Sequence, residues 1–511
     1  MKISASALKT VFFPLLFVMA ITIAYALVFT LSEFADSPYS SLNDFLELAF
    51  QWTAIAVGTF GLLYLLSINK YVFAMTFPLL VTFSTFLAYF RYTVNATLTP
   101  MTIELALVND LRTNMQVMSW QLIVLMLLSL LVSIAIVWFR WKKINFSRPF
   151  LHLIVAAGII FITNSLIPQL KRPLTQRMPY SMYYTFKTYF EIRDVAAEHR
   201  DTFTSESIAN SDSLVVVFVI GESLRNDHLQ INGYERETTP YLVKESNLIS
   251  LTDIYSEPCF THTSVPHIMT RADSLNPQRA YDEQSFVTIF NNAGFRTTWI
   301  ANQESVSTYA YFMNECDTLI YVNGSKSVYT FDKWIDEDIL PHLENELQDD
   351  NSKQLHIVHS IGSHWWYNSH YTDEFEVYKP VIESRVVSSN TQEEMINSYD
   401  NTILYTDHFL KNTIDLIRDK KSILIFLSDH GESLGEDGYY LHGTDRPELH
   451  HPAAFVWYSD KYEESFPDMI NNLKANSDKR YRSDYLFHSI IDAADITTEY
   501  NVPQLSIFRQ R

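Results

Sequence analysis

Cysteine, glycine and excess positive charge are all scarce in this sequence. Its 511 residues include only 2 cysteines and 12 glycines, which excludes a disulfide-rich scaffold and a collagen-like chain. The formal net charge is −20, so no surplus of basic residues is available to neutralise phosphates, and we expect no nucleic-acid partner. Hydrophobic residues make up 47% of the chain, which is enough for ordered domains with buried cores.

Long apolar runs that are almost free of charge lie in the first 170 residues. Each approaches the roughly 20 residues that a helix needs to cross a bilayer. Because five such runs follow one another, a membrane domain over residues 1–170 explains them better than buried core helices, or than a cleaved signal peptide at the first run. The predicted spans are about 11–31, 48–68, 71–90, 120–139 and 150–170.

Basic residues in the short loops between the spans indicate the orientation of the chain. Lys2 and Lys9 precede the first run, and residues 140–148, between the fourth and fifth runs, include four basic side chains. The N-terminus is therefore predicted to be cytoplasmic. With five spans, everything after about residue 170 lies on the other side of the membrane, although three basic residues just after the fifth run argue the other way.

The rest of the chain has the pattern of a linker followed by an α/β domain. Residues 171–210 alternate basic, aromatic and acidic groups, as in an amphipathic helix at the membrane surface or an ordinary linker helix. Short apolar runs at 214–223, 356–364 and 422–433 predict strands, and 395–419 predicts a helix. Strands that alternate with helices favour an α/β domain with a mostly parallel central sheet over residues 211–511.

Polar side chains follow the predicted strands at the point where each strand ends. Glu222 follows the first, His359 and His364 the second, and Asp429 and His430 the third. Taken singly, such residues are also explained as acids at helix N-termini or as core histidines. Because the carboxyl ends of parallel strands meet at one edge, the residues together predict a metal centre, and oxygen and nitrogen ligands suit Zn²⁺ or Mn²⁺.

The segment EPCFTHTSVPHIMT (257–270) is rich in hydroxyl groups and has the pattern of a loop that turns into a helix. A Thr or Ser at such a helix start is often only an N-cap. Beside a metal ion, a hydroxyl group could instead lose its proton and attack phosphorus or sulfur, forming a covalent intermediate. Both interpretations stay open at this point.

Five longer motifs follow one another along the chain: GESLRNDHLQINGYERETTPYL (221–242), THTSVP (261–266), HSIGSH (359–364), YDNTILYTDHFL (399–410) and SDHGESLGEDGYYLHG (428–443). In this order they resemble the bacterial phosphoethanolamine transferases of the alkaline phosphatase/sulfatase superfamily. That family also has five membrane spans before a periplasmic catalytic domain, so the resemblance covers nearly the whole chain. It implies a zinc-dependent, multi-pass inner-membrane enzyme with a sulfatase-like α/β domain in the periplasm, which we expect to be monomeric.

The resemblance implies a two-step transfer of phosphoethanolamine from phosphatidylethanolamine through a phosphoethanolamine-threonine intermediate. Glu222, Asp429 and His430 match the zinc ligands of the family, and Thr261 matches its nucleophile, which also contacts the zinc. An alignment anchored on the preceding cysteine would select Thr263 instead. The acceptor is left open between lipid A, core heptose, a periplasmic glucan and a surface protein.

The resemblance also implies residues that contact the substrate. His364 and His442 match histidines near the substrate phosphate, where they would assist the leaving group or bind a second metal ion. Asn109 and Thr113 match positions that contact the lipid donor, and Asn302 matches a position near the headgroup.

The cysteines depart from the pattern of the lipid A-modifying members, which carry several disulfides, including one that brackets the nucleophile. Here only Cys259 and Cys316 occur, and His267 stands where the second bracketing cysteine would fall. Whether Cys259 and Cys316 pair is left open. The low count favours a branch other than the disulfide-rich one.

Other functions fit parts of the same sequence. A phosphoglycerol transferase would share the scaffold and use phosphatidylglycerol. A sulfatase normally needs a Cys or Ser in a CxPxR-type sequence, and CFTHT (259–263) lacks both the Pro and the Arg. A membrane-anchored binding or sensor domain is the non-enzymatic alternative, which is disfavoured because every expected ligand position is filled.

Overall fold

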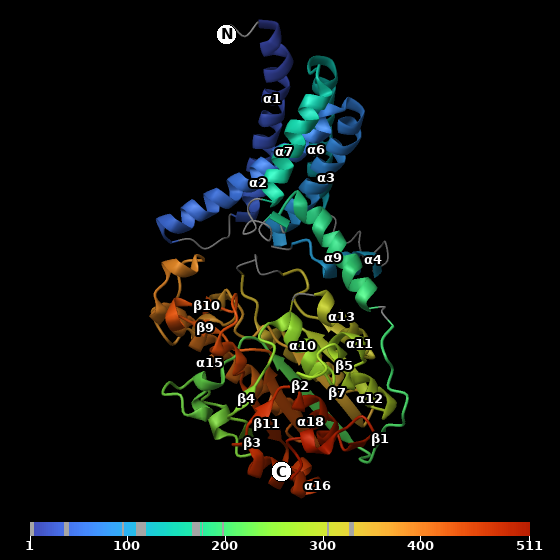
Figure 1. Ribbon diagram of the computed structural model, residues 1–511, viewed down its shortest axis with the longest axis vertical. Coiled ribbons are helices and arrows are strands. Elements are labelled where there is room, and N and C mark those ends of the chain that lie inside the picture. The colour runs from blue at the N-terminus through green and yellow to red at the C-terminus, as the bar shows by residue number, and fades with distance from the viewer. Residues whose placement is uncertain are drawn as a thin grey trace. The chain divides into compact units, whose positions relative to one another are not determined.

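The chain forms two compact units in the computed structural model, shown in Figure 1. The structure describes residues 5–34, 40–94, 97–108, 119–165, 174–175, 177–196, 199–303, 306–326 and 332–510. The first unit consists of Met1–Tyr189, Ser325–Phe331 and Glu383–Ser389. The second unit consists of Phe190–Gly324, Asp332–Ile382 and Asn390–Arg511.

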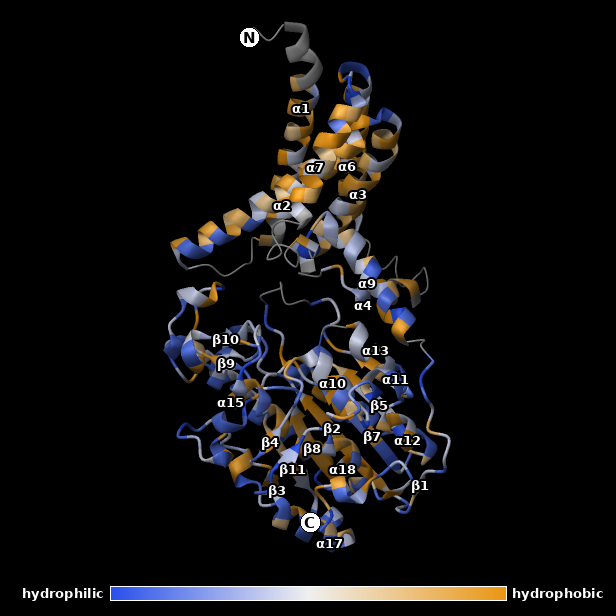
Figure 2. Ribbon diagram, in the orientation of Figure 1, coloured by the Kyte–Doolittle hydropathy of each residue, from blue (hydrophilic) through white to orange (hydrophobic). Residues whose placement is uncertain are grey.

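Within the described residues, four helices of the first unit are long and apolar enough to cross a membrane. Their ribbons are mostly in the hydrophobic colours of Figure 2, as expected of helices in a lipid environment. They are α1 (Ala5–Tyr25) with the turn that continues it to Thr30, α2 (Leu42–Ile68), α3 (Lys70–Val94) and α6 (Trp120–Lys143).

The fifth predicted span, 150–170, is not confirmed as a membrane helix. Helix α7 (Pro149–Ser165) is apolar but has only 17 residues, which is short for a full crossing. Residues 166–173, which would complete the span, lie outside the described part of the chain. The bridging segment predicted at 171–210 contains one helix in its described part, α9 (Tyr180–Ala196).

Polar contacts within the first unit hold helix ends in place. Arg140, in the last turn of α6, donates to the carbonyl oxygen of Ser67 at 2.6 Å, near the end of α2. It thereby satisfies a carbonyl that the end of α2 leaves without a helical partner. At the other end of α2, Asp44 forms a capping box with Ser41 and accepts a hydrogen bond from Ser384.

The second unit is built on a seven-stranded mixed sheet in the order β3-β11-β8-β2-β7-β5-β6. The five strands from β8 to β6 run parallel, as expected, but β11 pairs antiparallel with β8, and β3 pairs antiparallel with β11. The expectation of a mostly parallel sheet is therefore not confirmed at this edge. The strands are β2 (Leu214–Gly221), β3 (Leu248–Ser250), β5 (Arg296–Ala301), β6 (Thr318–Tyr321), β7 (Lys353–His359), β8 (Ser422–Ser428) and β11 (Ala454–Tyr458).

The antiparallel edge has a physical reason in the connection between β8 and β11. A parallel return requires a crossover, usually a helix of several turns. The described chain from 429 to 453 contains only two-residue strands and short 3-10 turns, so β11 comes back beside β8 in the opposite direction.

The core of the second unit lies around β2, whose eight residues are all buried. The middle of the sheet, where β2 and β8 lie, is largely hydrophobic (Figure 2). Alternate residues of β2 pack with helices α12 (Phe286–Asn292) and α18 (Tyr485–Ala493) in one cluster. The predicted helix at 395–419 is confirmed as α15 (Gln392–Ile417), which begins with a capping box formed by Thr391 and Glu394.

Candidate metal centre and active site

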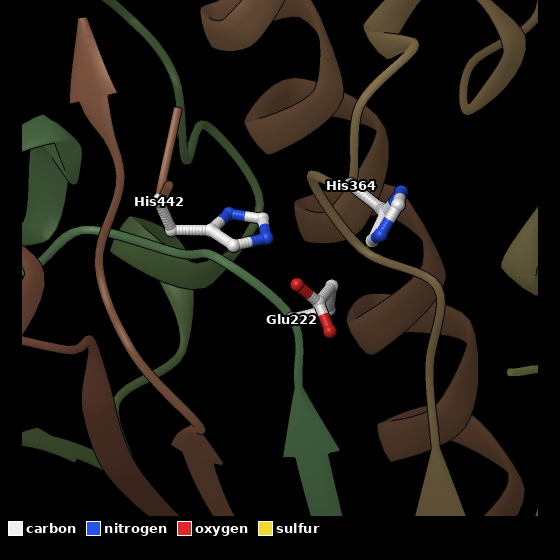
Figure 3. Close-up of side chains that lie close together, drawn as sticks. All are labelled: Glu222, His364 and His442. Carbon is white, nitrogen blue, oxygen red and sulfur yellow. The ribbon is translucent and has the colours of Figure 1, made fainter. Parts of the chain in front are cut away.

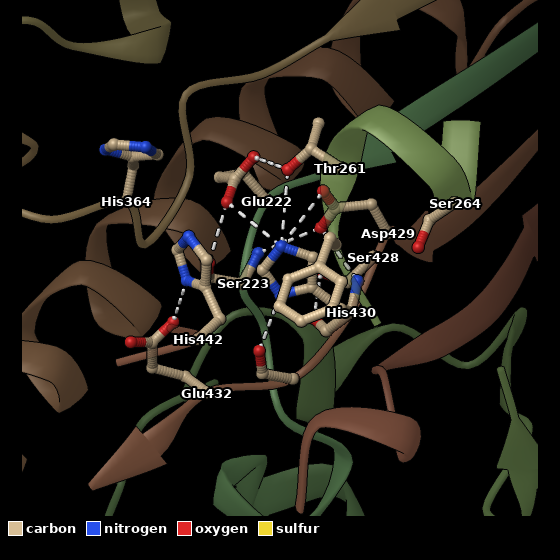
Figure 4. A network of polar contacts seen from close by, with 12 residues as sticks. Glu222, Ser223, Thr261, Ser264, His364, Ser428, Asp429, His430, Glu432 and His442 are labelled. Carbon is tan, nitrogen blue, oxygen red and sulfur yellow. Dashed lines mark hydrogen bonds and ion pairs between the residues drawn. The ribbon is translucent and has the colours of Figure 1, made fainter. Parts of the chain in front are cut away.

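Two acids and a histidine meet where β2 and β8 end, and Figure 4 shows their network. Glu222 directly follows β2, and Asp429 and His430 directly follow β8, which is the neighbour of β2. One ligand atom from each lies within 4.8 Å of the other two. All three side chains are buried, so the strand ends gather the groups that the sequence predicts.

The two carboxyl groups are buried without enough positive charge to balance them. Glu222 accepts hydrogen bonds from Ser223 Oγ at 2.7 Å and Gln303 Nε2 at 3.0 Å. Asp429 accepts from two backbone N–H groups, but its Oδ2 has no hydrogen-bond partner in the described chain. Burial, and then the charge of Glu222, raise the pKa of Asp429. Buried charges of one sign call for a cation.

His430 presents a free lone pair toward these acids. Its Nδ1 lies 2.7 Å from the carbonyl oxygen of Gly431, which can only accept, so Nδ1 carries the proton. Nε2 is then the basic nitrogen, and it lies 3.4 Å from Asp429 Oδ2 and 3.7 Å from Glu222 Oε1. A histidine fixed in this way through its other nitrogen is typical of a metal ligand.

The hydroxyl group of Thr261 completes the cluster. Thr261 is the first residue of α10 (Thr261–Met269), and its Oγ1 lies 3.2 Å from Glu222 Oε2 and 3.3 Å from His430 Nε2. Thr263 Oγ1 instead donates to the carbonyl oxygen of Phe260 at 2.9 Å, within the first turn of the helix. The structure thus brings Thr261 to the cluster and leaves Thr263 out of it.

These four groups fit a zinc ion. Three oxygen donors and one imidazole nitrogen converge, one carboxylate oxygen is buried and unpaired, and the imidazole presents its lone pair. This is a donor set that zinc accepts, and a hydroxyl ligand in the fourth position is a reactive one. Glu222, Thr261, Asp429 and His430 are the residues that would hold the ion.

Two further histidines flank Glu222, as Figure 3 shows. Ligand atoms of Glu222, His364 and His442 lie within 4.8 Å of one another, so the structure brings both predicted histidines to the cluster. His442 Nδ1 lies 2.8 Å from Glu432 Oε2. Burial opposes the charged imidazole, but the carboxylates of Glu432, Glu222 and Asp429 outweigh it and raise the pKa of His442 to about 9.

Two residues of the site were missed by the sequence analysis. Glu432 is buried and also accepts from Tyr367 Oη at 3.2 Å, so it is held on both oxygens. Gln303 bridges Glu222 and the carbonyl oxygen of Ser360. Gln303 lies two residues after β5, so the rule that polar residues just after a strand lie at the site, which found Glu222, could also have found Gln303. Glu432 does not lie just after a strand, so this rule does not identify it.

Asn302 is fully buried, and its side chain contacts other groups of the protein. Its amide donates to Asp336 Oδ1 at 2.9 Å and to the carbonyl oxygen of Ile335 at 3.0 Å, and accepts from Trp334 Nε1 at 2.9 Å. Asn109 and Thr113 lie outside the described residues. A donor-binding role for these three residues stays a prediction.

His359 lies in the core and belongs to none of the groups of potential metal ligands in the described residues. It is fully buried, with ring contacts to Trp299 and Tyr309 at 5.9 and 5.1 Å between centroids. Burial lowers the pKa of His359 to about 4, so the ring is neutral. Cys259 and Cys316 are free thiols, so no disulfide joins them in the structure.

The corner between Glu222 and Asp429 depends on an unusual backbone conformation. Ser223 has a φ of 57°, in the left-handed region that residues with a β-carbon seldom adopt. In this conformation its N–H donates to Asp429 Oδ1 at 3.1 Å while its hydroxyl donates to Glu222. Tyr399 Oη donates to its carbonyl oxygen at 2.6 Å and holds the corner.

Comparisons with known proteins agree with this fold. The family model described as Sulfatase matches residues 215–496, which is more than half of the chain. The Kdo(2)-lipid A phosphoethanolamine 7''-transferase of Escherichia coli (strain K12) is 37% identical over 272 residues, which are 52% of this chain and 47% of that protein. The chain thus spans about half the length of this curated relative.

Two solved structures have the same fold. The integral membrane lipooligosaccharide phosphoethanolamine transferase A from Neisseria meningitidis has a TM-score of 0.54 at 18% identity, over 96% of this chain and 98% of that one. The periplasmic domain of EptC from Escherichia coli, solved in complex with Zn, has a TM-score of 0.55 at 23% identity, over 61% of this chain and 90% of that one.

Proposed function

Because this chain belongs to the sulfatase family, we propose that it uses the shared scaffold as a phosphoethanolamine transferase. The observation that carries the proposal is the contact of the Thr261 hydroxyl with both Glu222 and His430. A hydroxyl group beside a buried acidic cluster that requires a cation is placed to act as a nucleophile rather than as a helix cap. The relatives named phosphoethanolamine transferases support this class of transfer over hydrolysis.

The first step transfers the headgroup from phosphatidylethanolamine to the enzyme. Thr261 passes its hydroxyl proton to Glu222, whose Oε2 already accepts from it, its oxygen bonds to phosphorus, and the bond from phosphorus to the diacylglycerol oxygen breaks. The departing oxygen takes up a proton, for which we propose His364 and His442 as donors because both flank Glu222. When bound, zinc would lower the pKa of the threonine hydroxyl and stabilise charge on the phosphoryl oxygens.

The second step passes the group to an acceptor. The acceptor hydroxyl gives its proton to the histidine that protonated the leaving group, and its oxygen bonds to phosphorus. The bond to Thr261 breaks, and the threonine oxygen takes back the proton held by Glu222. We propose a glycolipid of the lipid A class as acceptor, because relatives at 37% identity are named for it. The low cysteine count pointed away from lipid A, and these names indicate that the count does not decide the acceptor.

We propose that α7 and the residues after it complete a fifth span in the inner membrane. The N-terminus is then cytoplasmic and the second unit periplasmic, as the basic residues at 140–148 require. This placement gives Thr261 access to a lipid donor in the outer leaflet. The working unit is proposed to be a monomer.

The test is a transfer assay with the full chain in detergent, phosphatidylethanolamine vesicles and lipid A. The expected product is heavier than the acceptor by about 123 Da, the mass of one phosphoethanolamine group. An increase of about 154 Da with phosphatidylglycerol would identify a phosphoglycerol transferase instead. Sulfate release from an aryl sulfate without any transfer would identify a sulfatase.

A further inference from the structure

A second group of potential metal ligands lies in the second unit, separate from the residues assigned to the transfer reaction. It consists of Cys259, Asp445 and His450, and one ligand atom of each lies within 4.8 Å of the other two. Cys259 precedes α10 by two residues, whereas His450 ends the short 3-10 helix Pro447–His450. The group therefore joins two segments that are far apart in the sequence.

The contacts of His450 place both of its ring nitrogens against acceptor oxygens. Its Nδ1 lies 2.6 Å from the carbonyl oxygen of Ser256, so Nδ1 carries a proton. Nε2 lies 2.8 Å from Asp445 Oδ1, the separation of a hydrogen-bonded ion pair. A metal ion bound by the imidazole and the carboxylate would take the place of the proton between them.

The surroundings hold the three side chains in position. The ring of Tyr255 stacks on His450 with centroids 5.2 Å apart and 12° between the planes. Together with the Ser256 contact, this fixes both the tautomer and the orientation of the imidazole, as is usual for metal-binding histidines. Cys259 is 4% exposed, so its sulfur faces the group from the protein side.

We propose that Cys259, Asp445 and His450 form a second metal site that binds a zinc-class ion. One sulfur, one nitrogen and one carboxylate oxygen form a donor set that favours zinc over magnesium or calcium, because the latter two ions prefer oxygen donors. Three protein ligands leave the fourth position of a tetrahedral ion to water, which fits the exposed side of the site at Asp445, whose side chain is 71% exposed.

Such an ion would fix the start of the helix that presents Thr261. The backbone already joins the two segments once, since the N–H of Ser256 donates to the carbonyl oxygen of His450 at 2.9 Å. A metal bond through Cys259 adds a second connection, two residues before Thr261. The inference concerns a structural site and holds or fails independently of the transfer reaction.

The test uses cobalt in place of zinc in the full chain in detergent. A thiolate ligand to cobalt gives a charge-transfer band in the near ultraviolet, and the Glu222 cluster contains no thiol, so the band reports only this site. We expect the band in the unchanged protein and its loss in C259S and H450Q. With zinc, each of these variants should bind one ion per chain fewer than the unchanged protein.

The matched control is C316S, because Cys316 is the other free thiol and lies outside the group. C316S should keep the band and the full zinc content. The proposal is overturned if the unchanged protein shows no band, if the band survives in C259S, or if zinc content is equal in C259S and C316S. Should C259S fail to fold, D445N and H450Q decide the question by the same two readouts.

Discussion

Gly362 lies directly against the backbone of Glu222. A methyl group on Gly362 would come 2.8 Å from the carbonyl oxygen and 3.0 Å from the amide nitrogen of Glu222. Gly362 also has a φ of +48°. We expect Gly362→Ala to displace Glu222, to lower zinc affinity and transfer activity at least about tenfold, and to destabilise the fold by about 1–3 kcal/mol. Metal content, activity and thermal melting measure these effects.

The control for Gly362→Ala is Gly443→Ala. A methyl group on Gly443 would meet no heavy atom of the described chain within 4 Å, and Gly443 has no positive φ. This variant should therefore melt and react like the unchanged protein. Equal zinc content and activity in Gly362→Ala and Gly443→Ala would contradict the importance of the close contact.

The choice between the two threonines is decided by a pair of variants. Thr261→Ala removes the hydroxyl that contacts Glu222 and His430, and we expect transfer to fall by at least about 10³-fold. Thr263→Ala removes only a contact to the Phe260 carbonyl and should leave transfer within a few fold. Mass spectrometry of the enzyme should find the covalent phosphoethanolamine group in Thr263→Ala and not in Thr261→Ala. The opposite pattern would exclude Thr261 as the nucleophile.

The centre itself was predictable because its acids and His430 follow directly on apolar runs. An unbroken run of apolar residues predicts a strand, and the next polar residue marks its end. The positions of Glu222, Asp429 and His430 at strand ends can therefore be predicted from the hydrophobic pattern alone. Thr261 and Thr263 are two residues apart on one segment, and only the helix start at Phe260 decides which faces the acids.

Features that depend on loop paths or short elements were not predictable. Glu432 reaches the site through a loop whose course has no periodic signal. The edge strand β3 has only three residues, too few to show an alternating pattern. The apolar run at 150–170 predicts a full span, of which the structure describes only α7, with 17 residues. The burial of Asn302 depends on Asp336 and Trp334, which lie more than thirty residues away.

Asp429→Asn should separate metal binding from folding. The substitution keeps the shape of the side chain but removes the charge that faces His430, so we expect zinc affinity to fall by more than about 100-fold. Removing zinc with a chelator should abolish transfer in the unchanged protein, and adding zinc back should restore it. Competition with a fluorescent zinc chelator measures the affinity. Unchanged affinity in Asp429→Asn would contradict the assignment of this ligand.

Stability should depend on pH through Glu315. The carboxyl group of Glu315, a half-buried residue, lies against the start of α12, where it accepts from the Ser285 N–H at 3.1 Å and from Thr288 Oγ1 at 3.2 Å. Burial raises the pKa of Glu315 from 4.5 to about 7. Because the folded state holds this proton more tightly than the unfolded state, the free energy of unfolding should fall as pH rises from about 4.5 to 7, by up to about 3 kcal/mol.

Glu315→Gln removes this titration. It should therefore flatten the dependence of the melting temperature on pH between about 5 and 8 by the contribution of one titrating group. Glu344→Gln is the matched control because Glu344 is exposed on α14 (Leu340–Glu346). It should keep the slope of the unchanged protein. The same slope in both variants would mean that other groups dominate the pH dependence.

The backbone of Ser223 restricts which sequences can carry this centre. Its φ of 57° disfavours branched residues such as Val, Ile and Thr, while Gly and Asn tolerate it. Its hydroxyl contact with Glu222 disfavours Gly. The backbone conformation thus favours small residues, whereas the contact with Glu222 favours a side chain that donates a hydrogen bond. Serine meets both requirements. In a saturation library at this position, functional clones should therefore be limited to serine and a few small polar residues.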